Sequence, residues 1–126
     1  MVAQKDIVVA IDELSLSLLH PLNRKNKEMA AELRAMGFRI GKEACLRQLG
    51  CMLSRPDSRT DFPSIKVPTV VIGGRNDTVL PIAEQGEQAA GIKGARFVPI
   101  EDSGHFTQFE QPQAVTAVLR YWLQEG

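Results

Sequence analysis

Apolar residues recur at three- and four-residue spacings along the first half of the chain, which predicts helices there. We expect three helices, over residues 6–19, 25–36 and 42–53. The run Ile7–Ile11 is also typical of a strand, so a strand stays possible at that point. Pro21 should end the first segment, because the residue before a proline avoids the helical region. Gly37 is well placed to end the second helix in a left-handed conformation.

The third predicted helix carries an apolar stripe and both cysteines. We expect its inward side to consist of Cys45, Leu46, Leu49, Met52 and Leu53. Cys45 and Cys51 do not have a same-face spacing on a helix, so we expect no disulfide between them. Neither belongs to a CxxC pair or a His/Cys cluster, so no metal site is indicated. We interpret both as small buried apolar residues.

In the second half of the chain, short β-branched runs alternate with helical segments. Residues 67–74 form a nearly unbroken apolar run closed by two glycines, typical of a strand in a parallel sheet covered on both faces. The other elements expected are a helix over 81–90, a strand over 95–100 and a helix over 111–124. Pro99 cannot donate to a ladder, so its strand should lie at a sheet edge. This order predicts an α/β fold, with a helical segment in residues 1–59 and a parallel βαβα unit in residues 60–126.

Composition narrows the classes of function. The 126 residues are 44% hydrophobic and 24% charged, as in a globular domain. The 15 basic residues balance 15 acidic ones, so no nucleic-acid partner is indicated, since such proteins show a basic excess. No apolar run approaches the roughly 20 residues that span a bilayer. The N-terminus lacks the apolar core of a signal peptide. We therefore expect a cytoplasmic protein with no membrane partner.

Two polar side chains follow the two predicted strands. Asp77 comes after the first strand and its two glycines, and His105 comes after the second strand. The carboxyl ends of neighbouring parallel strands share one edge of the sheet, so the two side chains can meet there. A carboxylate on one imidazole nitrogen fixes the tautomer and leaves the other nitrogen free as a base. Either residue alone is more typical of a turn, but together they favour a functional pair.

Three stretches in the second half resemble the α/β-hydrolase superfamily. Residues 65–81 resemble the segment with the triad acid: I-x-V-P-T, an apolar strand, then G-x-x-D and a proline. Residues 94–106 resemble the segment with the triad histidine, and residues 110–112 the E-x-P that often follows. The resemblance implies the C-terminal portion of an α/β-hydrolase fold, with Asp77 as triad acid and His105 as triad base. The first half resembles the superfamily's cap region more loosely, so the helices before the βαβα unit are cap-like.

The superfamily's nucleophile elbow, G-x-S-x-G, is absent from this sequence. None of its serines has the flanking glycines, and both cysteines lie in a predicted helix rather than at a strand-to-helix turn. The segment that would form an oxyanion hole is absent as well. We therefore assign no nucleophile and expect the isolated chain to be inactive.

Several other polar or aromatic residues have structural explanations that we prefer. His20 precedes a proline at a helix end, where contact within the cap region is favoured over catalysis. Arg55, Asp57 and Arg59 are typical of a solvated turn, although they could bind an anion. The glycines at 73–74 are no phosphate loop, because Lys-Ser/Thr is absent. Phe106 and Phe109 could either line a substrate pocket or pack near His105.

Two functions follow from these observations. The first is the acid/base half of a serine hydrolase that acts on a small-molecule ester or on related acyl or C–C bonds, without cofactor or metal. The second is a truncated, inactive hydrolase remnant or an interaction module. A two-stranded parallel sheet is a poor core, and an unpaired strand seeks another chain. We therefore expect either a homo-oligomer or a separate chain that supplies the missing half of the sheet.

Overall fold

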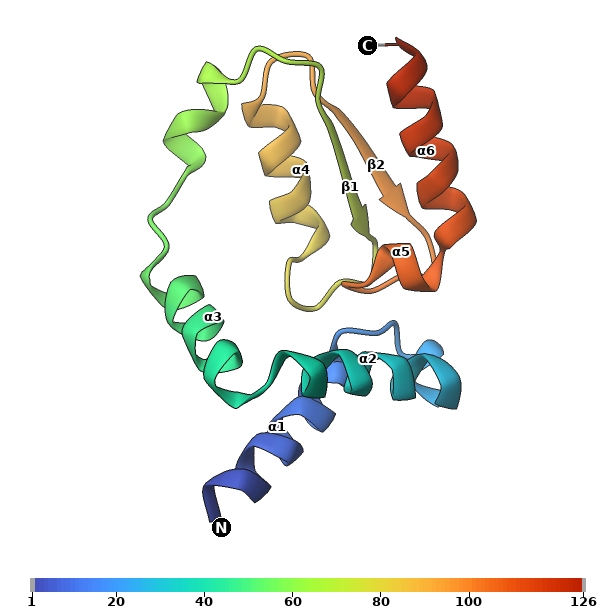
Figure 1. Cartoon of the computed structure of the whole chain (residues 1–126). Coiled ribbons are helices and arrows are strands. Elements are labelled where there is room, and N and C mark those ends of the chain that lie inside the picture. Colours follow the sequence, from blue (N-terminus) through green and yellow to red (C-terminus); the bar gives the residue numbers. More distant parts are fainter. Residues whose placement is uncertain (1, 126) are drawn as a thin grey trace.

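The computed structural model describes residues 2–125 as a mixed α/β fold (Figure 1). The N-terminal part contains three α-helices and two short 3₁₀ segments: α1 (Val2–Ser17), η1 (Asn23–Lys25), α2 (Lys27–Ile40), α3 (Lys42–Ser54) and η2 (Arg59–Ser64). The rest comprises β1 (Val70–Gly74), α4 (Ile82–Gly91), β2 (Arg96–Ile100), α5 (Thr107–Glu110) and α6 (Pro112–Glu125). No helix in the described part of the chain is long and apolar enough to cross a membrane.

The first two helices pack against each other, and α1 is a helix rather than the alternative strand. The prediction that Gly37 ends the second helix is wrong, since α2 continues to Ile40. A Cβ atom on Gly37 would lie only 2.8 Å from the Ile11 side chain, so this glycine allows α1 and α2 to approach closely. Gly41 ends the helix instead, with a φ of 77° that a residue with a side chain rarely adopts.

The prediction that the apolar stripe of α3 points inward is also wrong. Four of its leucine and methionine side chains are at least half exposed: Leu46, Leu49, Met52 and Leu53. Cys45 is half-buried and Cys51 is exposed, so the expectation of two buried cysteines is not met either. The chain turns at Gly41, so α3 extends away from the other helices (Figure 1). Helical spacing alone identified the stripe, but within residues 2–125 no element covers it.

The second half of the chain forms the predicted parallel βαβα unit. β1 and β2 pair in parallel, from Val70 beside Arg96 to Gly74 beside Ile100. α4 packs on both strands and α6 packs on β2, so the two helices flank the sheet (Figure 1). Pro99 lies in β2, which is an edge strand because the sheet has two strands within residues 2–125. The short helix α5 was not predicted, since a single turn carries no periodic signal.

The surface of the chain is large for its mass. Its accessible area is 8928 Å² for 13.9 kDa. A compact monomer of this mass exposes about 6,700 Å². The uncovered stripe of α3 contributes to this excess. The outer edge of β1 has no strand partner among the described residues. The largest buried apolar side chains are few: Ile11, Leu19, Leu33, Ile92 and Ile100.

Candidate active site

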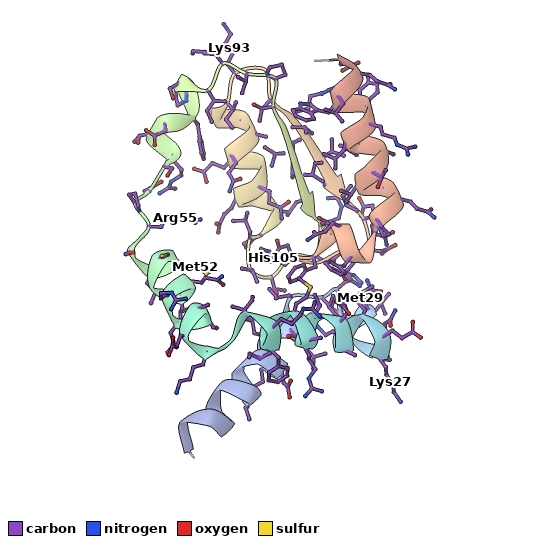
Figure 2. The ribbon with its side chains drawn as sticks, in the orientation of Figure 1. Lys27, Met29, Met52, Arg55, Lys93 and His105 are labelled. Carbon is purple, nitrogen blue, oxygen red and sulfur yellow. The ribbon has the colours of Figure 1, made fainter. Side chains whose placement is uncertain are left out.

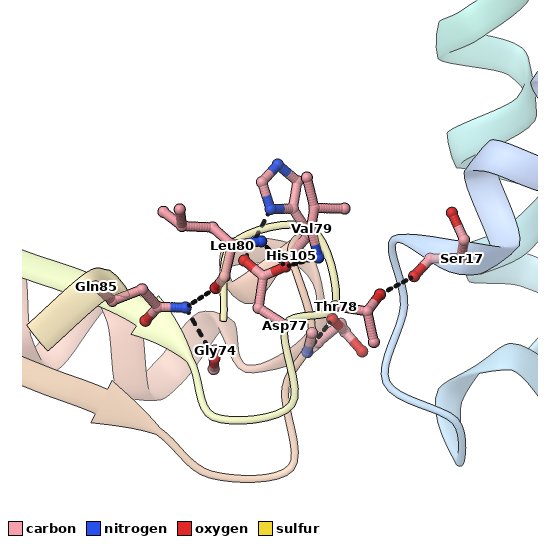
Figure 3. Close-up of polar contacts among 10 residues, drawn as sticks. Ser17, Gly74, Asp77, Thr78, Val79, Leu80, Gln85 and His105 are labelled. Carbon is pink, nitrogen blue, oxygen red and sulfur yellow. Dashed lines mark hydrogen bonds and ion pairs between the residues drawn. The ribbon is translucent and has the colours of Figure 1, made fainter. Parts of the chain in front are cut away.

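Asp77 and His105 are in direct contact at the carboxyl ends of the two strands. The Asp77 loop begins at the end of β1, and the His105 loop begins at the end of β2. Because the strands are parallel neighbours, both loops leave the same edge of the sheet. His105 Nδ1 lies 2.8 Å from Asp77 Oδ2, as a dashed line in Figure 3 shows. The pair that the sequence singled out is therefore a hydrogen-bonded dyad.

The carboxylate of Asp77 is fixed, whereas the imidazole of His105 is accessible. Oδ1 of Asp77 accepts hydrogen bonds from the backbone N–H groups of Val79 (2.8 Å) and Leu80 (3.0 Å) (Figure 3). The Asp77 side chain is 5% exposed and that of His105 is 39% exposed. A carboxylate on Nδ1 favours the tautomer with its proton there, so Nε2 keeps a lone pair and can act as a base.

Backbone hydrogen bonds hold the two loops together beyond the strands. Arg75 N donates to Ile100 O (2.9 Å), and Asn76 N donates to Ser103 O (2.9 Å). Asp102 turns the second loop with a φ of 50°, a left-handed conformation that aspartate tolerates better than most residues. Two residues after β1 thus continue its hydrogen bonding to the segment that ends β2 and follows it. This brings Asp77 close to His105.

The two glycines at the end of β1 allow close packing around the Asp77 loop. A Cβ atom on Gly74 would lie 1.9 Å from Gly104 O, and one on Gly73 would lie 1.9 Å from Gln85 Oε1. Gln85 is 2% exposed, and its amide donates to Gly74 O (3.1 Å) and Leu80 O (2.7 Å). Gln85 therefore supports the Asp77 loop from α4, a role that its sequence position did not reveal.

Both loops also contact the end of α1 or the segment that follows it. Thr78 Oγ1 donates to Ser17 O at 3.2 Å (Figure 3). The backbone N–H of His105 donates to Leu18 O at 2.8 Å. Figure 2 shows His105 at the end of the sheet that faces the N-terminal helices. The helical first part of the chain therefore helps to position the dyad.

The remaining histidine and the two phenylalanines have structural contacts. His20 is 9% exposed, and its Nδ1 accepts a hydrogen bond from Leu22 N at 3.2 Å. The Phe106 ring meets the His105 ring edge to face, with centroids 6.0 Å apart, and Phe109 contacts Phe106 in the same way at 5.7 Å. These rings form an aromatic row beside the dyad, so the packing alternative applies to them.

The charged turn near α3 lies well apart from the dyad, as the positions of Arg55 and His105 in Figure 2 show. Arg59 pairs with Asp57 (2.5 Å) and with Glu87 (3.5 Å). The side-chain hydrogen bond from Arg59 lowers the pKa of Asp57 to about 2. These three side chains line a hollow of about 760 Å³, together with Arg55 and Glu84. Carboxylates accompany the guanidinium groups there, as expected of a solvated charged turn.

Neither a metal centre nor a nucleophile is found in the described part of the chain. It has no group of three or more His, Cys, Asp and Glu side chains that could hold a metal ion. No serine among residues 2–125 hydrogen-bonds to His105; Ser15, for example, donates to Ile11 O, and Ser103 is fully buried. Within residues 2–125, no serine hydroxyl joins the Asp77–His105 pair.

Three known proteins match most of this chain, whereas the chain spans less than half of each of them. No family model matches the chain. It is 30% identical to the AB hydrolase superfamily protein YisY of Bacillus subtilis (strain 168) over 96 residues, which cover 74% of this chain and 36% of YisY. The structure of an enol-lactonase from Burkholderia xenovorans LB400 matches 92% of the chain with a TM-score of 0.83 and 26% identity.

A third protein, a thermophilic esterase from Thermogutta terrifontis, matches 93% of the chain with a TM-score of 0.76 and 29% identity. The chain spans 44% of the enol-lactonase and 43% of the esterase. The two strands, their flanking helices and the helical segment before them thus have counterparts in complete enzymes. By sequence and by structure, the chain is related to the α/β-hydrolase superfamily and matches part of that fold.

Proposed function

We propose that the chain supplies the acid and the base of a Ser-His-Asp hydrolase that cleaves esters or related acyl or C–C bonds. The observation that most directly supports this proposal is the 2.8 Å contact between His105 Nδ1 and a buried carboxylate oxygen of Asp77. The names of the similar esterase and enol-lactonase favour ester and lactone substrates. No cofactor is needed, because side chains and water are sufficient for this chemistry.

In the proposed reaction, Asp77 orients His105 and stabilises the imidazolium that forms. Nε2 of His105 removes the proton from a serine hydroxyl, and the serine oxygen attacks the carbonyl carbon. The imidazolium then protonates the leaving group, which leaves an acyl-enzyme. His105 next takes a proton from water as the water oxygen attacks the acyl carbon. The imidazolium then gives this proton to the serine oxygen as its bond to the acyl carbon breaks, which releases the acid and regenerates the serine.

The serine must come from polypeptide outside these 126 residues, because G-x-S-x-G is absent from them. The outer edge of β1 has no strand partner within residues 2–125 and can accept a further parallel strand. The surface excess of about 2,200 Å² over a compact monomer is comparable to a stable protein interface. A second copy of the chain could cover this edge but would bring no serine elbow. A segment with the rest of the sheet supplies both.

A chimera tests the proposal. The part of the enol-lactonase that matches this chain, 44% of its length, is replaced by residues 1–126. We expect the chimera to hydrolyse p-nitrophenyl butyrate, and the isolated chain to be inactive. Asp77→Asn should lower kcat on the order of 10⁴-fold, because the amide favours the wrong tautomer of His105. His105→Ala should be comparably inactive.

Asp61→Asn is the matched control, because Asp61 is an exposed residue of η2 outside the dyad. It should retain the activity of the parent chimera. A cooperatively folded chimera whose activity equals that of its His105→Ala variant would refute the acid/base role. That result would favour the second candidate, an inactive remnant or interaction module, which the missing elbow and the free strand edge support.

A further inference from the structure

Glu110 is a buried carboxylate that no ion pair explains. It is 8% exposed and ends α5. Oε2 accepts hydrogen bonds from His20 N (2.7 Å) and Asn23 Nδ2 (2.8 Å), and Oε1 accepts one from Gly104 N (2.7 Å). No Lys or Arg pairs with Glu110 within residues 2–125. Because burying a charge is costly, its neutral hydrogen-bond donors must keep this group in place.

The donors of Glu110 come from two parts of the chain that meet at the dyad. Gly104 immediately precedes His105, whereas His20 and Asn23 lie in the segment between α1 and α2. The two parts are in backbone contact as well. A Cβ atom on Gly104 would lie 2.7 Å from both His20 N and Leu18 O. One carboxylate therefore joins the loop of the candidate base to the segment after α1.

Two residues at this junction are among the most buried in residues 2–125. Leu19 is 1% exposed and Ser103 is fully buried. The N–H of His105 donates to Leu18 O, so the residue itself is also tied to that segment. Its ring is 39% exposed and contacts Asp77 and Phe106, so it meets Asp77 only if the backbone beneath it is held in place. The orientation of the ring toward Asp77 therefore depends on the backbone beneath it.

We propose that Glu110 is a positioning residue for His105: by joining Gly104 to His20 and Asn23, it fixes the backbone that aims the imidazole at Asp77. This inference rests on the proposed function only for its catalytic meaning, because the geometry can be measured without turnover. Glu110 contacts no reacting atom. Its effect passes through the N–H of Gly104.

The test is the variant Glu110→Gln in the full chain. Glutamine keeps the shape, but its NH₂ group must face either the Gly104 N–H or the His20 N–H, donor against donor. We expect hydrogen exchange at the amides of Gly104 and His105 to accelerate by about tenfold or more, as for the loss of one charge-assisted hydrogen bond. Amides in β1 and β2 should exchange as in the wild type.

The second measurement is the ¹⁵N spectrum of the histidine rings, which has two ring systems to assign because the chain has 2 histidines. In the wild type, His105 should show a protonated Nδ1 that is hydrogen-bonded to a carboxylate. Glu110→Gln should convert this signal to a mixture of tautomers. The control, Glu101→Gln, removes an exposed carboxylate of the same loop that pairs with Arg75, and should leave both readouts unchanged.

The proposal is overturned if Glu110→Gln leaves the ring signal and the two amides as in the wild type. It is also overturned if the strand amides lose protection to the same extent, since that indicates a general structural role. If Glu110→Gln does not fold, the variant Asn23→Ala replaces it in the test. A smaller acceleration of hydrogen exchange that is confined to Gly104 and His105 supports the proposal. Unchanged exchange at these two amides overturns it. A wild type that lacks the Asp77–His105 signature counts instead against the proposed function.

Discussion

Replacement of Gly74 by alanine would place a methyl group where the two loops of the dyad meet. The new Cβ atom would lie 1.9 Å from Gly104 O and 2.5 Å from Ser103 O. Both are backbone atoms, so no side-chain rotation can relieve the overlap. Gly104 O would have to withdraw by about 1.1 Å to reach the 3.0 Å at which Cβ contacts begin to occur. A shift of that size moves the backbone that carries His105.

The size of the effect follows from two opposing contributions. Overpacking of a close-packed site costs about 1–3 kcal/mol, and we expect the upper end because backbone must move. Loss of a glycine from the unfolded chain stabilises the protein by only about 0.4–1 kcal/mol. The net loss of roughly 2 kcal/mol should lower Tm by about 8 °C for a chain of this length. The Asp77–His105 separation should exceed 3.5 Å, and its hydrogen bond should be lost.

Gly50→Ala is the control for this substitution. Gly50 lies inside α3, and a Cβ atom there would meet nothing within 4 Å. It should stabilise the helix by about 1 kcal/mol, so the two Gly→Ala variants should differ in sign. Thermal unfolding and the ¹⁵N signal of the His105 ring measure both effects. A Gly74→Ala protein with a wild-type Tm and an intact ring signal would refute the view that this contact sets the approach of the loops.

Two further substitutions test packing and charge. Leu19→Ala should lower the free energy of unfolding in urea by about 2–5 kcal/mol, because Leu19 is 1% exposed. Leu53→Ala, at an 82% exposed position, should leave this free energy near that of the wild type. Equal effects would contradict the assigned core. Arg59→Gln should raise the pKa of Asp57 from about 2 toward its ordinary 3.8, followed by NMR titration of the carboxyl. Because the pKa of Asp57 is lowered, its pair with Arg59 stabilises the protein above pH 3.8, and this stabilisation is lost as the pH falls through 2. The wild type and Arg59→Gln should therefore converge in stability at lower pH.

The βαβα unit and the dyad were predictable because their signals are local. Each strand is a short β-branched run, and each candidate residue follows its strand directly. Parallel pairing then brings Asp77 and His105 to one edge of the sheet without any further information. The proximity of Asp77 and His105 thus depends on two short segments and one topological rule.

The supports of the dyad were not predictable, because they depend on contacts between distant parts of the sequence. Nothing near Gln85 indicates that its amide reaches two carbonyls of the Asp77 loop. Glu110 stood out only as part of E-x-P, and two of its three donors, His20 and Asn23, lie about 90 positions earlier in the sequence. Gly37 illustrates the opposite error: a helix-ending residue by local rules serves the packing of α1 on α2.

The hydrogen bonds that join residues 17–23 to the second half of the chain also bear on the order of folding. Strands β1 and β2 pair residues that lie 26 positions apart, from Val70 with Arg96 onward. The hydrogen bond from Thr78 to Ser17 O spans 61 positions, and the one from His20 N to Glu110 spans 90 positions. Closure of a longer loop costs more entropy, so the strand pair should assemble first. We therefore expect the dyad to become ordered in the last folding step and to be the first region to open under mild denaturant.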